Sequence, residues 1–109
     1  SRIYKYLLWW ESQKYKPAKP LEGPLSMCCI VYRSIPTRWS KKKKQLAEEG
    51  KILPVTKPDV DNYLKGIKDA FNKLLYKDDS QIVRYHGDTG KYYSFRPRIE
   101  IEIKEIICE

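Results

Sequence analysis

The sequence predicts a single α+β domain in which a mixed β-sheet packs with helices. Three observations support this fold class. The 109 residues suffice for one domain with a modest core. Apolar residues recur at helical spacing around residues 62–75, whereas residues 25–35 and 96–106 are rich in strand formers or alternate in polarity. A hydrophobic content of 41% also excludes a disordered chain.

The first part of the chain predicts a helix followed by a central strand. Residues 2–13 place four apolar or aromatic side chains at helical spacing: Ile3, Tyr6, Leu7 and Trp10. A proline-rich connection follows. Residues 25–35 are rich in strand formers and apolar on both faces over 27–32, which indicates a central strand covered on both sides that ends at Pro36.

A short helix is predicted between Ser40, a suitable N-cap, and Gly50, a suitable C′ residue. Its charges oppose the helix dipole, with four lysines at the start and two glutamates at the end, each costing a few tenths of a kcal/mol, roughly. Lysines over a helix N-terminus would form a strong phosphate site. The alternative is a mobile, solvated loop, which could still become ordered on binding nucleic acid.

The clearest amphipathic helix is predicted from about Asn62 to Leu75. Its apolar face consists of Leu64, Ile67, Phe71, Leu74 and Leu75. Residues 80–88 then predict a strand, and residues 87–90 a turn. Residues 96–106 alternate cleanly, which predicts a half-exposed strand with isoleucines on one face (Ile99, Ile101 and Ile103) and charges on the other (Glu100, Glu102 and Lys104).

The net charge of +8 favours a polyanionic partner, most simply nucleic acid, over a basic protein without such a partner. No apolar run approaches the ~20 residues of a membrane span and no signal peptide pattern is present, so no membrane partner is expected. The three cysteines give no disulfide framework; Cys28 and Cys29 are expected to be buried small residues. With a single histidine there is no zinc spacing either, and we expect a reducing cytoplasm.

Two aspartates stand at a predicted junction between extended chain and helix. Pro58 favours an extended Lys57, so Asp59 and Asp61 would point to the same side. The two carboxylates would repel each other unless a divalent cation lay between them. Mg²⁺ takes one or two carboxylates together with waters and phosphate oxygens.

A purely structural role for these acids is the alternative. Asp61 or Asn62 could cap the helix, and Asp61 could pair with Lys65 one turn later. Asp78 and Asp79, just before the next strand, could likewise form only a turn. Together, however, paired acids, a nearby lysine and a basic surface are the parts that metal-dependent phosphodiester cleavage needs.

The combination "KPDVDNYLK", "DAF", "YKDDSQIV" and "PRIEIEI", preceded by "LEGPLSMCCIVYRSIPTRWSKKKK", resembles the RusA-type Holliday-junction resolvases, which are found largely on prophages. The resemblance covers about Leu21 to Ile103. It implies a homodimeric endonuclease, dependent on Mg²⁺ or on Mn²⁺ in its place, that nicks four-way DNA junctions symmetrically in recombination and repair. It implies no small-molecule cofactor, and a bacterial or phage origin.

By position, the resemblance implies catalytic acids at Asp59, Asp61 and Asp79 and an essential lysine at Lys65, with Asp78 as a less critical metal ligand. DNA binding is expected of a basic set: Arg38, Lys41, Lys42, Lys43, Lys44 and Lys57.

The resemblance also predicts that residues 1–109 form one RusA-like endonuclease domain from which the family's N-terminal strand, with its basic Lys/Arg-Pro-Arg segment, is missing, so that Ser1 lies inside the next helix. The alternative function is a junction-binding module without cleavage activity. A general single-strand binder would interleave aromatics with the basic run, where only Trp39 is adjacent.

A straight helix over residues 62–75 would be roughly 20 Å long, and the few residues between it and Asp79 span at most ~13 Å. Asp79 would then reach Asp59 and Asp61 only if the helix ended early and the chain folded back, or if the acid came from a second subunit. A two-fold axis that packs the helices antiparallel would bring the acids together. The apolar face of the helix could supply that contact or could pack on the sheet.

Overall fold

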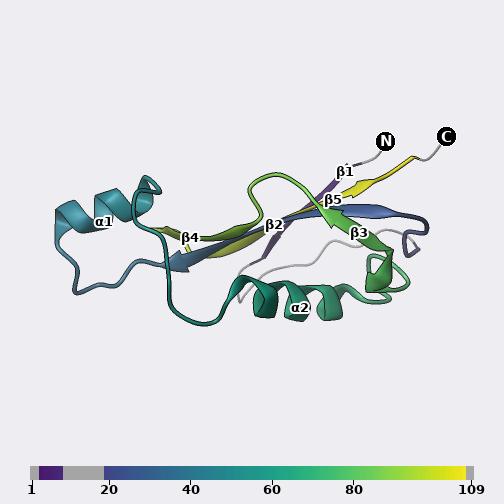
Figure 1. Cartoon of the computed structure of the whole chain (residues 1–109), viewed down its shortest axis with the longest axis horizontal. Coiled ribbons are helices and arrows are strands. Elements are labelled where there is room, and N and C mark those ends of the chain that lie inside the picture. The colour runs from purple at the N-terminus through teal and green to yellow at the C-terminus, as the bar shows by residue number, and fades with distance from the viewer. Residues whose placement is uncertain (1–2, 9–18, 108–109) are drawn as a thin grey trace.

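The computed structural model describes residues 3–8 and 19–107. In chain order the elements are β1 (Ile3–Leu8), β2 (Leu25–Ser34), α1 (Lys41–Glu48), α2 (Val60–Phe71), the 3₁₀ turn η1 (Asp79–Gln81), β3 (Ile82–Tyr85), β4 (Gly90–Ser94) and β5 (Arg98–Glu105). The molecule is elongated, with extents of 50 × 29 × 22 Å, and α1 lies at the end opposite to β3 (Figure 1).

The strands form one mixed sheet in the order β1-β5-β2-β3, with β4 also paired to β2. β5 runs antiparallel to β1 and β2, whereas β3 and β4 run parallel to β2. β2 has ten residues, so β3 pairs with its first part and β4 with its second part along the same edge. The prediction of an α+β domain on a mixed sheet is confirmed.

The core lies between α2 and one face of the sheet (Figure 1). From β2 and β5 it takes alternate residues, and from α2 it takes Leu64, Ile67 and Phe71. The predicted alternation of β5 is confirmed, since Ile101 and Ile103 are buried. β2 is central as predicted, but only its face toward α2 is fully covered: Cys29 is buried, while Cys28 on the other face is half-buried.

The helix predicted over residues 2–13 is wrong where the structure describes the chain, and Ser1, which was placed inside a helix, lies outside the described residues. Residues Ile3–Leu8 form a strand at the edge of the sheet, and residues 9–13 lie outside the described part. The free edge of β5 offers a complete ladder of hydrogen bonds to this segment, whose isoleucine and tyrosines favour strands. Tertiary pairing therefore overrides the apparent helical spacing.

Two further differences concern the second half of the chain. α2 ends at Phe71 instead of Leu75, because Asn72 leaves the helical region and Lys73 has a φ of 66°. Leu75 and Tyr76 are nevertheless buried after the helix ends. The strand β4 was not predicted; its Tyr92 and Tyr93 are strand formers, but the preceding turn obscured a run of five residues. Within the described residues no helix is long and apolar enough to span a membrane.

Candidate active site

Asp59 is the residue that caps α2. Its Oδ1 atom accepts a hydrogen bond from the Asn62 backbone N–H at 2.9 Å, so the cap lies earlier than the predicted Asp61 or Asn62. Asp61 lies in the first turn and Lys65 one turn later, and the side chains of Asp59, Asp61 and Lys65 are all exposed. No ion pair joins Asp61 to Lys65 among the interactions of the described residues, so the structural pairing considered above is not formed.

The segment that leads into Asp59 is fixed to the sheet by two cations. Lys91 Nζ donates to the carbonyl oxygens of Thr56 at 2.8 Å and Pro58 at 3.1 Å, and Arg33 Nη1 donates to the Thr56 carbonyl at 2.8 Å. Arg33 comes from β2 and Lys91 from β4, on neighbouring strands. These residues position the acids at the start of α2, and nothing in their local sequence had marked them.

Asp78 has a structural role as the N-cap of η1. It caps η1 by accepting from the Ser80 N–H at 2.9 Å, while the Gln81 side chain accepts from the Asp78 N–H at 2.9 Å. The hydrogen bonds from Ser80 hold the pKa of Asp78 below its usual value. Gln81 also donates to the carbonyls of Leu21 and Gly23, both at 3.0 Å, which ties η1 to the chain before β2.

Asp79 is half-buried beside the C-terminal part of α2. A hydrogen bond with Tyr85 raises the pKa of Lys68, and the neighbouring carboxylates of Asp79 and Asp69 raise it further. The Lys68 ammonium lies 5.5 Å from the centre of the Tyr85 ring. Lys68 is therefore the lysine of α2 whose pKa Asp79 influences within one chain, and the sequence reasoning did not single it out. The predicted Lys65 lies one turn after Asp61.

The acids thus form two separate groups in one chain. Lys68, which is close to Asp79, lies nine residues after Asp59, or about 13 Å along the helix axis. Across the residues that the structure describes, no three His, Cys, Asp or Glu side chains meet in a way that could hold a metal ion. Asp59 and Asp61 alone still match the one or two carboxylates that Mg²⁺ accepts.

The basic run forms a true helix. Ser40 Oγ caps α1 by accepting from the Lys43 N–H at 3.2 Å, and Gly50 follows the helix with a φ of 80°, as predicted. Lys43 lies 4.1 Å from the centre of the Trp39 ring, which itself packs edge-on against Tyr93 at 5.3 Å. No carboxylate pairs with any of the four lysines among the described residues. Arg38 and Lys57 are also exposed.

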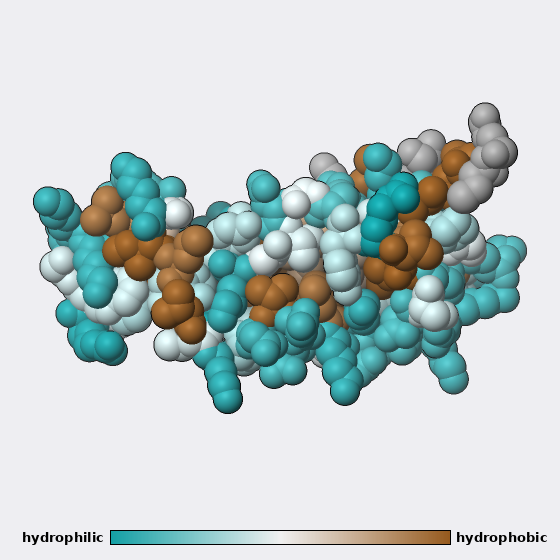
Figure 2. Space-filling model, in the orientation of Figure 1, coloured by the Kyte–Doolittle hydropathy of each residue, from teal (hydrophilic) through white to brown (hydrophobic). Residues whose placement is uncertain are grey.

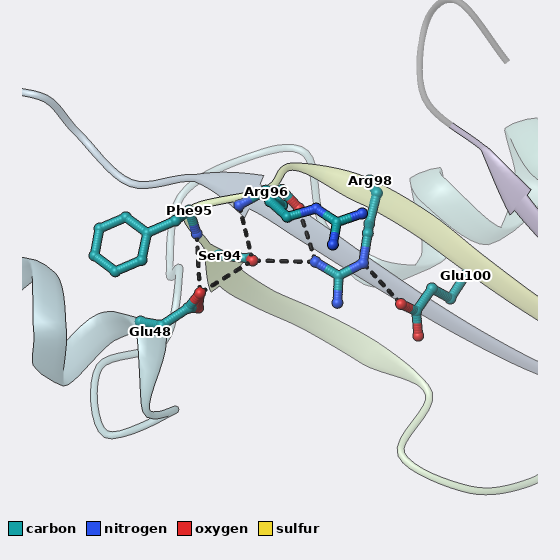
Figure 3. A network of polar contacts seen from close by, with 6 residues as sticks. All are labelled: Glu48, Ser94, Phe95, Arg96, Arg98 and Glu100. Atoms are coloured by element: carbon teal, nitrogen blue, oxygen red, sulfur yellow. Dashed lines mark hydrogen bonds and ion pairs between the residues drawn. The ribbon is translucent and has the colours of Figure 1, made fainter.

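The glutamate that seemed misplaced at the end of α1 attaches this helix to the sheet (Figure 3). Glu48 Oε1 accepts from the Phe95 N–H at 3.3 Å and from Ser94 Oγ at 3.5 Å. Arg98 Nη1 donates to Ser94 Oγ at 3.1 Å, and Arg98 Nε donates to Glu100 at 2.7 Å. The network fixes α1 through its C-terminal end and leaves the lysines at its N-terminal end facing solvent.

Comparison with known proteins gives a consistent result. The family model for Endodeoxyribonuclease RusA matches residues 1–104. An "Uncharacterized protein YqaN" of Bacillus subtilis (strain 168) is 46% identical over 108 residues, which is 97% of this chain and 75% of that protein. The "Crossover junction endodeoxyribonuclease rusA" of Lactococcus phage r1t is 44% identical over 104 residues, covering 93% of this chain and 71% of its own length. No solved structure gives a significant match. With the family model extending over nearly the whole chain, this protein belongs to the RusA family of endodeoxyribonucleases.

Proposed function

We propose that this endonuclease resolves four-way DNA junctions by paired symmetric nicks, with Mg²⁺ or Mn²⁺ as cofactor, during recombination and repair in a bacterial or phage-infected cytoplasm. The observation that carries the proposal is the exposed pair Asp59 and Asp61 at the N-terminus of α2, with Lys65 one turn later. The name of the phage relative supports the junction as substrate. Figure 2 shows hydrophilic residues along the outer side of α2 and a mixture of hydrophilic and hydrophobic residues at the α1 end.

Asp59 and Asp61 would hold the metal, and Asp79 would complete its ligands. The bound metal supplies a polarised phosphoryl oxygen and an activated water. Asp59 Oδ1 accepts a hydrogen bond from the Asn62 N–H, and this bond fixes the orientation of the carboxylate. Lys65 would stabilise negative charge on the phosphate or on the leaving oxygen. Asp78 is assigned a lesser part, since its carboxylate already caps η1.

A homodimer with shared sites would unite the two groups of acids. The apolar face of α2 packs on the sheet and so is not free for a partner. The opposite face carries Gly66, where an added Cβ would meet no atom within 4 Å, and the exposed Ala70 one turn later. Such a face lets a second helix approach closely. An antiparallel pair of α2 helices would place the Asp79 end of one subunit beside Asp59 and Asp61 of the other.

A nicking assay on a synthetic mobile junction tests the function. With each arm labelled in turn, Mg²⁺ should produce paired nicks in two opposite strands, and EDTA should abolish them. A linear duplex of the same sequence is the control and should remain intact. Binding of the junction without any nicking would favour the alternative of a non-cleaving junction-binding module, whereas equal cutting of the linear duplex would contradict selectivity for junctions.

Replacing Lys41, Lys42, Lys43 and Lys44 by alanine is expected to weaken binding to every DNA shape. The slope of log affinity against log salt should flatten by up to ~0.9 for each phosphate that the variant no longer neutralises. The fold should survive, because α1 is attached to the sheet through Glu48 and not through its lysines. Affinities for a junction and a duplex at several salt concentrations measure the effect.

The matched control is Lys51→Ala, which removes an exposed lysine that already pairs with Glu49 at 3.2 Å. It should leave the salt slope unchanged. If the quadruple variant also binds both DNA shapes as the wild type does, the lysine run is only a solvated surface.

A further inference from the structure

A cavity of about 430 Å³ lies at the β3 end of the sheet, on the face opposite to the core. Four of its lining residues are polar or basic: Ser26, Arg84, His86 and Lys104. The segment 105–107 forms the rest of the wall and contributes Glu105, Ile106 and Ile107. None of these residues belongs to the candidate active site, which lies at α2 and η1.

Three of the polar residues stand in one row across the sheet. Ser26 of β2 pairs with Arg84 of β3 on one side and with Lys104 of β5 on the other. Strands are about 4.8 Å apart, so the two cations rise from Cα positions about 10 Å apart with a hydroxyl between them. Paired residues on adjacent strands share one face of the sheet. This row therefore places one positively charged residue on each side of Ser26.

His86 determines the direction of the hydrogen bond that the Ser26 hydroxyl makes. Its Nδ1 atom lies 2.6 Å from Ser26 Oγ, and its Nε2 atom lies 2.9 Å from Glu102 Oε1. Because the carboxylate accepts from Nε2–H, a neutral ring accepts the Ser26 proton at Nδ1. Ser26 itself is only 3% exposed, so its hydrogen bond with His86 is largely shielded from solvent.

The charge around the cavity favours an anion. Neither Arg84 nor Lys104 has a salt bridge among the residues that the structure describes. The carboxylate of Glu102 is already engaged by His86, which leaves Glu105 as the acidic group on the wall. Two unpaired cations, one of them an arginine, match the oxygens of a phosphate. Ile106 and the 66% exposed Ile107 offer an apolar wall beside it, suited to a sugar.

We propose that this cavity binds a phosphate group of the DNA backbone, held by Arg84 and Lys104, away from the cleavage centre. The assignment to DNA rests on the proposed function. β3 follows η1 directly, so Arg84 comes five residues after Asp79 and lies at most ~17 Å from it along the chain. The cavity opens on the face of the sheet opposite to α2, so DNA that contacts both places would pass around the β3 edge of the sheet. The second contact would then fix the register of an arm.

His86 is the single histidine of the chain, which gives the test a unique probe. Its ring resonances are followed by NMR in the full chain during two titrations, one with inorganic phosphate and one with junction DNA in EDTA. Both ligands should shift the His86 signals in a saturable way. Replacing both Arg84 and Lys104 by alanine should abolish the phosphate shift, weaken junction binding and flatten its salt slope by up to ~0.9, because one phosphate is no longer neutralised.

Two other double variants serve as controls. Lys51→Ala with Lys77→Ala removes two lysines that pair with Glu49 and Glu22, and it should keep the phosphate shift. Arg84→Lys with Lys104→Arg keeps both charges and should retain most of the shift, which separates the loss of charge from a loss of folding.

The possible results distinguish a DNA phosphate from a free anion as the ligand of the cavity. A His86 signal that ignores both ligands would overturn the site. A shift with inorganic phosphate but none with junction DNA would overturn the assignment to DNA and leave a site for a free anion. Should the junction remain uncut in Mg²⁺ while both ligands still shift His86, the nuclease proposal would fail and the phosphate site would stand.

Discussion

Asp61→Asn is expected to lower the rate of junction nicking by on the order of 10³-fold or more, because each ~1.4 kcal/mol of lost transition-state stabilisation costs a factor of ten and a metal ion supplies several kcal/mol. Junction binding should persist or become tighter, since one negative charge near the phosphates is removed. Asp61 is exposed and lies in the first turn of α2, so the substitution should not disturb the fold.

Nicking rates at saturating enzyme, junction affinity in EDTA and circular dichroism together measure this effect. Asp88→Asn is the matched control, because it removes an exposed aspartate in the turn between β3 and β4, away from both groups of acids. It should cut at the wild-type rate. Loss of both binding and cleavage in the Asp61 variant, with an unchanged spectrum, would argue against a purely catalytic role.

The sequence was informative wherever periodicity and burial agreed. β5 alternates strictly, and its isoleucines do face the core. The short helix after Ser40 begins and ends at its predicted caps, although its charges oppose the dipole. Glu48 explains this conflict: its carboxylate is used to attach α1 to β4, so a tertiary contact offsets the cost to the isolated helix. The unfavourable position of Glu48 in the helix dipole is therefore explained by a contact with distant residues, which the sequence of the helix alone does not predict.

The errors arose where pairing between distant segments decides the outcome. Residues 3–8 carry a helical spacing of apolar side chains, but the unpaired edge of β5 draws them into a strand. The end of α2 was placed too late because apolar residues continue past it: Leu75 and Tyr76 are buried from a non-helical segment. A hydrophobic pattern reports burial, and burial alone does not distinguish the last turn of a helix from the chain that follows it.

In the candidate active site, too, the local motif was predictable from the sequence and the contacts between distant residues were not. The positions of Asp59, Asp61 and Lys65 followed from a short local motif, and the structure places them together at the start of α2. Lys91 and Arg33, which hold the preceding segment, lie at large sequence separations from it. Contacts of this kind leave no periodic signal in a single sequence. The catalytic roles of the acids and of Lys65 remain predictions.

The second large effect is predicted from an active site that combines acids of two subunits. Mixing an Asp61→Asn subunit with an Asp79→Asn subunit, each inactive alone, should restore nicking. In a shared arrangement both lesions of the mixed dimer fall in one site, and the other site is intact. With free exchange, about half of the dimers are mixed and about a quarter of all sites are active. Because only one site per dimer works, the products should be single nicks and not paired ones.

A reciprocal mixture provides the control and has the opposite outcome under the two arrangements. Wild-type subunits are mixed with a variant that carries both Asp61→Asn and Asp79→Asn. With shared sites, every site of the mixed dimer lacks one acid, so the mixed dimer is inactive. With sites built within one chain, the wild-type subunit keeps its own site, and the first mixture should instead yield nothing.

Subunit exchange is verified with two distinguishable tags before nicking is measured. Absence of recovery in the first mixture, together with activity of mixed dimers in the second, would refute the shared site. The structure favours the opposite result, because within one chain Asp79 lies beside Lys68 near the C-terminal end of α2, whereas Asp59 and Asp61 lie at its N-terminal end. A second copy whose α2 ran antiparallel across Gly66 and Ala70 would bring those two ends together without any change of fold.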